Sequence, residues 1–211
     1  ILYVSSNSSV TGLAVVPPYP GQSDMAYIQG NAATGPRTSG GAGSSVGGGR
    51  TEFSPAQRQR PQSSRGTPPI GIRVQGLPLL KPPYGTISAI DLREGTIAWQ
   101  IPHGQTPDRV AQHPMLEGTD LPRTGQNASV GTLVTKTLLI AGEGELTVDE
   151  NGVRRAMLRA YHKTTGTEVG AVALPAPQSG SPMTYMLNGE QYIVLAVSGG
   201  GYSGELIALR L

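Results

Sequence analysis

Few residues in this chain have the types and spacing that chemistry requires. Histidine occurs only at positions 103, 113 and 162, which is too scattered for the ligand spacing of a metal site. The stretch GSSVG at 43–47 has the Gly-x-Ser-x-Gly pattern of serine hydrolases, but no strand or helix is predicted beside it to form the required elbow. The chain has no cysteine, which excludes disulfides, thiolate metal sites and cysteine nucleophiles.

Acidic side chains gather near one predicted turn. Glu143, Glu145, Asp149 and Glu150 would attract a cation, but the regular ligand spacing of a calcium-binding loop is absent. We therefore expect a solvated acidic turn, and we predict no metal ligands within this chain.

The composition indicates a β-rich protein with many turns. The 211 residues include 30 glycines and 18 prolines, and 14% are charged, against about 25% in average proteins. A net charge of +2 is too small to indicate nucleic-acid binding. The chain starts without methionine and within a predicted strand. We therefore expect the carboxy-terminal part of a longer protein, whose export signal lies outside this segment.

The apolar pattern predicts strands and no helix. Apolar residues alternate, or form short runs bounded by Gly, Pro, Asn and Asp. Asn188 and Gly189 are predicted to form a two-residue hairpin turn. The predicted strands are 1–5, 12–16, 24–28, 85–91, 96–101, 131–135, 137–141, 156–161, 167–173, 182–187, 191–197 and 204–210.

Two long segments carry no strand pattern. Residues 34–66 hold only Val46 and Phe53 as large apolar side chains, so we predict a disordered or mobile insertion there. The irregular stretch 102–129 is richer in Pro and His, and we expect it to be ordered.

One phrase occurs twice. AIDLREGTIAW at 89–99 aligns with AYHKTTGTEVG at 160–170, pairing Trp99 with Gly170. The copies are 71 residues apart, and removing the stretch 102–129 leaves 43, within the roughly 40 to 50 residues of one propeller blade. A small alanine, a polar turn residue, a glycine with positive φ and a docking tryptophan all serve packing between radially stacked sheets. The alternative is that any β-hairpin with a TG or EG turn gives this pattern.

These residues carry a resemblance to a family. AIDLREGTIAW resembles the tryptophan-docking motif of dehydrogenases that depend on pyrroloquinoline quinone (PQQ). KPPYGTISAIDL, SVGTLVTKTLLIAGEG, RAYHKTTGTEVG, SGSPMTYMLNGEQYIVLAVSGGG and GELIALRL extend it over about residues 81–211, in the order of the membrane-type glucose dehydrogenase branch. The resemblance implies an all-β fold with about three to four blades of an eight-bladed propeller. Residues 1–30 are similar to a preceding blade, and residues 1–211 form the carboxy-terminal part of the propeller domain.

The resemblance also implies a cofactor site. In this family PQQ lies on the propeller axis and Ca²⁺ holds the quinone, with most calcium ligands and the catalytic aspartate in earlier blades. We therefore expect those residues outside this chain, and the catalytic residues stay unknown. GQNASVGTLVT resembles the segment that enters an inner strand beside the cofactor. The residues that we expect to contact PQQ are Asn127, Ser129, Val130 and Gly131, with Arg123 and Thr124 added because PQQ carries three carboxylates.

The implied function is oxidation of a sugar or alcohol by PQQ, with electrons passed to a quinone or cytochrome in the periplasm. The remaining propeller blades are the other expected partner. Two alternatives stay open on the sequence. One is a non-catalytic propeller scaffold that binds protein partners, and the other is a ligand-binding domain.

Overall fold

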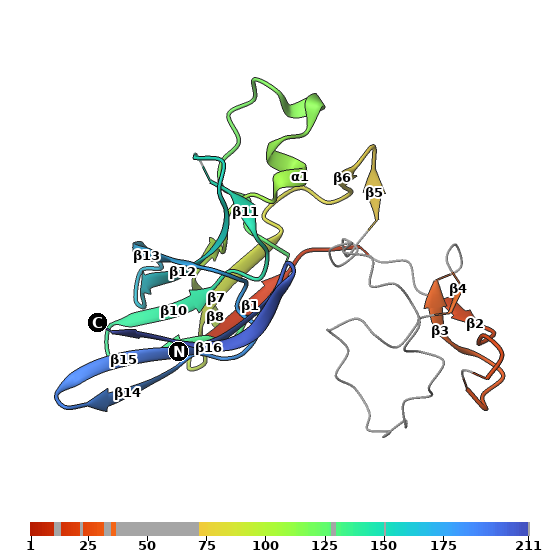
Figure 1. Cartoon of the computed structure of the whole chain (residues 1–211). Coiled ribbons are helices and arrows are strands. Elements are labelled where there is room, and N and C mark those ends of the chain that lie inside the picture. Colours follow the sequence, from red (N-terminus) through yellow and green to blue (C-terminus); the bar gives the residue numbers. More distant parts are fainter. Residues whose placement is uncertain are drawn as a thin grey trace. The chain divides into compact units, whose positions relative to one another are not determined.

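The computed structural model describes residues 1–10, 14–21, 23–31, 35–36, 72–127, 130–149 and 151–210. The chain divides into a larger unit, Ile1–Val10 with Gly71–Leu211, and a smaller unit, Thr11–Ile70. Strands dominate the described parts of both units (Figure 1). The insertion predicted at 34–66 lies outside the described residues, apart from 35–36.

The first sheet of the larger unit joins the start of the chain to a segment far along it. It contains β1 (Leu2–Asn7), β7 (Gly85–Asp91) and β8 (Thr96–Pro102) in antiparallel order. β1 pairs with β7 along its whole length. The expectation that residues 1–30 form a separate preceding blade is therefore wrong for β1. The apolar pattern predicts the strand at 1–5, but it does not show which strand pairs with it. That partner, β7, begins only at Gly85.

The second sheet is a meander in chain order. β9 pairs with β10, β10 with β12, and β12 with β13, all antiparallel, while the short β11 pairs with the start of β12. The strands are β9 (Thr132–Val134), β10 (Leu138–Gly142), β11 (Thr147–Val148), β12 (Arg154–His162) and β13 (Glu168–Leu174). Four antiparallel strands in this order are the architecture of one propeller blade.

The third sheet contains β14 (Met183–Leu187), β15 (Glu190–Gly199) and β16 (Tyr202–Arg210), again antiparallel and in chain order. Asn188 and Gly189 have φ values of 51° and 82° and connect β14 to β15. The predicted hairpin turn is therefore confirmed.

Short elements lie before β7 and after β8 in the sequence. β5 (Arg73–Val74) and β6 (Leu77–Pro78) form a hairpin, and the stretch 102–129 contains α1 (Asp108–Ala111) and the 3₁₀ turn η2 (Pro114–Leu116). The prediction of no helix is wrong for these two turns, because a single turn is too short to display a helical period.

The described part of the smaller unit is one antiparallel sheet. It contains β2 (Ala14–Val16), β3 (Ile28–Asn31) and β4 (Gly35–Pro36). The strand predicted at 24–28 thus begins at its last residue and continues beyond it.

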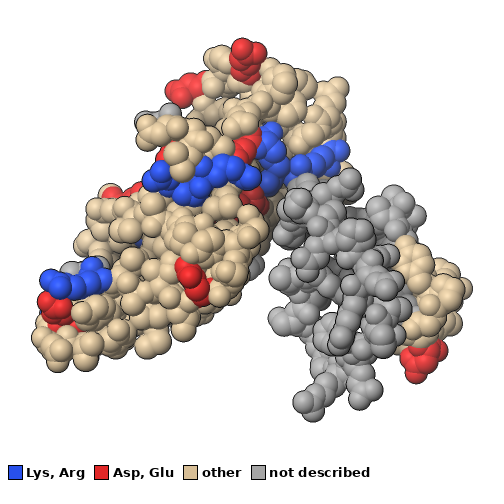
Figure 2. Space-filling model, viewed as in Figure 1, with Lys and Arg blue, Asp and Glu red and all other residues tan. Residues whose placement is uncertain are grey.

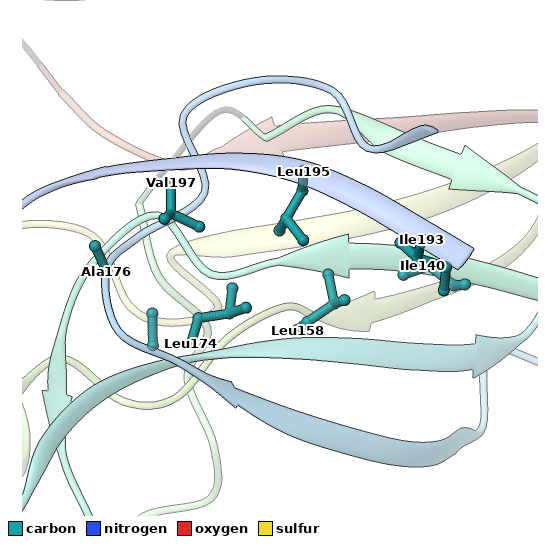
Figure 3. Close-up of a cluster of buried hydrophobic side chains, with 8 residues drawn as sticks. Ile140, Leu158, Leu174, Ala176, Ile193, Leu195 and Val197 are labelled. Atoms are coloured by element: carbon teal, nitrogen blue, oxygen red, sulfur yellow. The ribbon is translucent and has the colours of Figure 1, made fainter. Parts of the chain in front are cut away.

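The central strands of the second sheet, β10 and β12, are buried on both faces. On one face Leu139, Ala141 and Tyr161 pack with Ile87 of the first sheet and with Val130. On the other face a larger cluster joins the second and third sheets: Ile140, Ala156, Leu158, Leu174, Ala176, Ile193, Leu195 and Val197 (Figure 3). Because successive strand residues point to opposite faces, the continuous apolar run of β10 supplies both clusters. The all-β propeller prediction agrees with these sheets packed face to face.

The two copies of the repeated phrase form the same turn. The N–H of Gly95 donates to the carbonyl of Asp91, and that of Gly166 to the carbonyl of His162, both at 2.8 Å. Both glycines have positive φ, 68° and 73°. A β-bulge falls at the alanine of the phrase in each copy. The two copies therefore share the same turn and the same bulge position.

Trp99 joins the first sheet to the second. Its indole Nε1 donates to the carbonyl of Lys163 at 3.1 Å, and the hydroxyl of Tyr3 donates to the same oxygen at 3.0 Å. A Cβ placed on Gly166 would lie 2.8 Å from Cε3 of the indole, so the ring lies directly on that glycine. The predicted docking of Trp99 on the next blade is confirmed.

Candidate functional site

Buried polar groups gather where the first sheet meets the second. We call this cluster the polar junction, defined by His103, Thr124, Gln126, Glu143 and Arg159, each of which is buried. Its members come from the end of β8, the irregular stretch that follows, the end of β10 and the middle of β12. The junction therefore depends on three segments of sequence held together by sheet packing.

Glu143 is the central acceptor of the polar junction. Its Oε1 accepts from Nε of Arg159 at 2.9 Å and from the N–H of Gln105 at 2.9 Å, and its Oε2 accepts from the N–H of Met157 at 3.0 Å. The Nη2 of Arg159 lies 2.7 Å from Oε1 as well. Burial raises the pKa of Glu143, although Arg159 opposes that rise. Since every one of these contacts is an N–H donor, the side chain is held as a carboxylate.

A second carboxylate extends the network toward solvent. Nη1 of Arg159 donates to Oε1 of Glu168 at 2.8 Å, and Nη1 of Arg123 donates to Oε2 of the same residue at 2.6 Å. Burial disfavours the Arg159 cation, but Glu143 and Glu168 outweigh that effect and raise its pKa. Figure 2 shows Lys and Arg side chains in a band across the visible face of the larger unit, with acidic side chains against it.

His103 locks the first sheet to the second. Its Nδ1 lies 2.9 Å from the hydroxyl of Tyr161, and its Nε2 lies 3.0 Å from the carbonyl of Gly142. A carbonyl only accepts, so Nε2 carries the proton and Nδ1 accepts from the tyrosine hydroxyl. Burial lowers the pKa of His103 to about 4, which keeps the imidazole neutral. Burial also raises the pKa of Tyr161.

Two buried glutamine amides connect neighbouring segments. The amide of Gln126 accepts from the N–H of Glu145 at 3.0 Å and donates to its carbonyl at 3.3 Å. The amide of Gln178 accepts from the N–H of Gly142 at 2.6 Å and donates to the carbonyl of Gly131 at 2.8 Å. The segment that precedes β9 is thus held from both sides.

The predicted cofactor contacts have different surroundings. Thr124 is buried and its hydroxyl donates to the carbonyl of Gly125 at 3.3 Å. Val130 belongs to the apolar cluster between the first and second sheets. A Cβ on Gly131 would lie 2.3 Å from Oγ of Ser181, so the close approach that this glycine permits is to a protein segment. Ser129 lies outside the described residues.

Asn127 is the predicted residue with an unused polar atom. Its Oδ1 is buried and has no hydrogen-bond partner among the described residues. A buried amide oxygen without a partner costs about 1–3 kcal/mol, and such groups commonly await a ligand, a water or an ion. Arg123, in the same loop, has a side chain that is 33% exposed. In this loop, therefore, the amide of Asn127 and the guanidinium of Arg123 are the groups that could bind a ligand.

The expectation of a solvated acidic turn is wrong for Glu143 and Glu145. Glu143 is fully buried in the polar junction, and Glu145 forms an ion pair with Arg109 at 2.9 Å. Asp149 does form a turn, accepting from two backbone N–H groups at 2.9 Å, while Glu150 is outside the described residues. The sequence shows that these acidic residues are close together, but it does not show that β10 ends at Gly142, directly before Glu143.

Neither did the histidine pattern identify the role of His103. For all three histidines we expect surface or loop positions, and His103 does lie in the loop directly after β8, but it is buried between two partners because β8 ends against the second sheet. Within the described ranges no group of three His, Asp or Glu side chains is placed to hold a metal ion.

The Glu143–Arg159 pair was missed by sequence reasoning, although one signal pointed to it. Arg159 stands between Leu158 and Ala160 in a strand whose other residues are mostly apolar. An arginine in a strand covered on both faces requires a buried carboxylate. The stretch around Glu143 was available as its partner.

With this geometry described, comparison with known proteins places the chain in a family. Residues 8–193 match the family model described as "PQQ: Glucose/ethanol/alcohol dehydrogenase, beta-propeller domain". The chain belongs to this PQQ β-propeller family. The predicted fold class and family are thereby confirmed.

Curated relatives carry dehydrogenase names. The chain is 36% identical over 139 residues to a probable quinate dehydrogenase (quinone) of Xanthomonas campestris pv. juglandis, covering 62% of this chain and 15% of that protein. It is 33% identical over 132 residues to the quinate/shikimate dehydrogenase (quinone) of Acinetobacter baylyi, with the same coverage. It is 33% identical over 133 residues to the quinoprotein glucose dehydrogenase of Escherichia coli, covering 61% of this chain and 15% of that protein. The chain thus spans about 15% of the length of these relatives. No helix in the described ranges has the length and apolar character of a membrane span.

Proposed function

We propose that this chain is part of a quinoprotein oxidoreductase that oxidises a hydroxyl group of a sugar or alcohol. The observation that carries the proposal is the family match over residues 8–193. The similar proteins are named as dehydrogenases of quinate, glucose and glycerol, all of which bear several hydroxyl groups. The same names favour the enzyme over the scaffold alternative, because these similar proteins are named as dehydrogenases.

Two side chains of the predicted loop fit PQQ. Arg123 offers a partly exposed guanidinium, which suits one of the cofactor's carboxylates. Asn127 offers a buried amide whose oxygen has no partner among the described residues, and amide oxygen and nitrogen are interchangeable by rotation of the group. The other described members of the predicted set, Thr124, Val130 and Gly131, act through backbone position rather than through free polar atoms.

The bound quinone supplies an electrophile that accepts a hydride from the alcohol. This chain's own residues hold Arg123 in position toward the cofactor. Glu168 fixes the guanidinium of Arg123 at 2.6 Å, and Arg159 fixes Glu168 at 2.8 Å. Because Arg159 is itself held by the buried Glu143, the exposed cation is anchored to the core of the second sheet.

We place the Ca²⁺ ligands and the catalytic base in blades outside this chain, as the family resemblance implies. Those blades also complete the eight-bladed ring, for which the three sheets of the larger unit supply one full blade and parts of two others. We propose a quinone or a cytochrome as the electron acceptor and the periplasm as the location. The word quinone in the names of two relatives supports the first acceptor.

Reconstitution tests the proposed function. The protein at its full natural length is incubated with PQQ and Ca²⁺, desalted, and assayed by dye reduction with quinate, glucose and glycerol. We expect retained quinone absorbance and turnover of at least one substrate. Loss of all quinone absorbance on desalting, together with no dye reduction, would remove the enzyme hypothesis and leave the scaffold reading.

Asn127 gives a residue-level test of the same site. Replacing Asn127 with Ala is expected to weaken PQQ binding by about tenfold, because one hydrogen bond to a charged or strongly polar ligand is lost. Asn151→Ala, in the exposed β11–β12 turn, is the matched control and should bind PQQ like the parent protein. Equal PQQ affinity in both variants and the parent would show that Asn127 does not contact the cofactor.

A further inference from the structure

A second cluster of polar side chains lies outside the polar junction, where the β5–β6 hairpin meets α1. Arg73 begins β5 and Arg109 lies in α1. The Nε atoms of both arginines are buried and have no hydrogen-bond partner among the described residues. Buried guanidinium N–H groups without acceptors are rare in native proteins, because each loses its hydration without compensation.

The hairpin is held in place against the insertion that carries α1. Nε2 of His113 lies 2.8 Å from the carbonyl of Gln75, in the turn between β5 and β6. A Cβ on Gly76 would lie 3.3 Å from the same imidazole nitrogen, so the turn and the histidine are in close contact. Arg73 is therefore presented from a fixed turn rather than from a free loop.

Arg109 pairs with Glu145, and both groups act electrostatically on Arg73. Nη1 of Arg109 forms an ion pair with Oε2 of Glu145 at 2.9 Å. The pKa of Arg73 is lowered, first by burial and then by repulsion from Arg109, while Glu145 acts in the opposite direction. The nearby Asp108 is already engaged, since it accepts from the N–H of Val148 at 2.8 Å. Asp108 is offset by its ion pair with Arg154 at 3.5 Å, so Arg73 and Arg109 against Glu145 leave the cluster with a net positive charge.

The cluster borders solvent through Arg109 and Glu145, and the two Nε atoms lie beneath that surface. The side chains of Arg109 and Glu145 are 28% and 32% exposed. It is also connected to the predicted cofactor loop, because the backbone of Glu145 exchanges two hydrogen bonds with the amide of Gln126. Gln126 is followed in the chain by Asn127, whose side-chain oxygen also has no hydrogen-bond partner among the described residues.

We propose that Arg73 and Arg109 form a binding site for the carboxylate group of a small organic acid. Paired guanidinium groups match a carboxylate in both charge and donor geometry, and two unused Nε–H donors supply the hydrogen bonds. The carboxylate belongs either to a hydroxy-acid substrate or to the PQQ cofactor, which share this chemistry. The substrate source rests on the proposed dehydrogenase function and would favour a hydroxy acid over a neutral sugar.

Binding measurements test the site without relying on turnover. Quinate, and glucose as a neutral polyol of similar size, are titrated into the PQQ-free protein at full natural length by calorimetry. PQQ is titrated separately by its absorbance. The variants are Arg73→Gln, Arg73→Lys and, as a matched loss of one charge, Arg93→Gln in the exposed β7–β8 turn. Circular dichroism checks that each variant is folded.

The expected result is that Arg73→Gln raises the dissociation constant of one carboxylate ligand by about tenfold or more. Arg73→Lys should restore part of the affinity, glucose binding should not change, and Arg93→Gln should behave like the parent. An effect on quinate assigns the site to the substrate, and an effect on PQQ assigns it to the cofactor. Unchanged affinity for both acids in a folded Arg73→Gln variant overturns the proposal. If quinate binding depends on Arg73 but the protein has no dehydrogenase activity, the carboxylate site is supported and the proposed dehydrogenase function is rejected.

Discussion

Adding a single methyl group at Gly166 tests the docking of the two blades. This glycine has φ of 73°, and a Cβ there would lie 2.8 Å and 2.9 Å from two atoms of the Trp99 indole and 3.1 Å from Cγ2 of Ile101. The left-handed backbone costs about 1–2 kcal/mol for a residue with a side chain. Forcing the methyl group against the ring costs about 1–3 kcal/mol more. Gly166→Ala should therefore destabilise the protein by roughly 2–5 kcal/mol.

Gly95 supplies a matched control in the other copy of the phrase. Its φ is 68°, but a Cβ there would meet nothing within 4 Å. Gly95→Ala should thus show only the backbone cost of about 1–2 kcal/mol. Both variants are compared by urea unfolding followed by circular dichroism. In a Trp99→Ala background the steric cost at Gly166 should fall to what the contact with Ile101 leaves. Equal destabilisation by the two substitutions would refute the docking role assigned to Trp99.

Two further predictions concern the polar junction. Glu143→Gln should destabilise the protein by about 3–5 kcal/mol in urea unfolding, because Arg159 is left buried without its main carboxylate, whereas Glu168→Gln, at a side chain 26% exposed, should cost clearly less. The free energy of unfolding should fall by about 3 kcal/mol as the pH is lowered from about 6.5 to about 4, because His103 binds a proton in the unfolded chain but stays neutral in the folded one. The unfolding free energy of His103→Asn should depend less on pH across this range. A steeper or unchanged profile in His103→Asn would contradict the neutral assignment, and equal costs for the two glutamate substitutions would contradict the burial argument.

The sequence predicted the sheets well wherever the partners were local. The β14–β15 hairpin followed from Asn188 and Gly189, whose small or αL-tolerant side chains allow the turn. Docking of Trp99 followed from the spacing of the repeated phrase. The pairing of β1 with β7 could not be predicted, because no local pattern records which distant strand completes a sheet.

The candidate site was predicted less completely. The loop around Asn127 came from a family resemblance, and the partnerless oxygen there became visible only in three dimensions. The sequence predicts a solvated turn for Glu143 and a surface or loop position for His103. The burial of both could not be predicted, because it depends on the meeting of three segments rather than on neighbouring residues. Local chemistry in the sequence thus identifies candidates, while burial selects among them.

The distant pairing of β1 affects how the protein is made. At roughly 5–20 residues per second of synthesis, β1 emerges several seconds before β7 exists, and its edge hydrogen bonds wait for that strand. The intervening stretch adds little entropic cost to closure, since each doubling of a loop costs only about 0.6 kcal/mol. The smaller unit, whose β2 and β3 pair locally, is complete in sequence before that closure begins. β1 therefore lacks its β7 partner while the intervening residues are synthesised, and a nascent chain paused before residue 85 would leave that pairing edge open to chaperones.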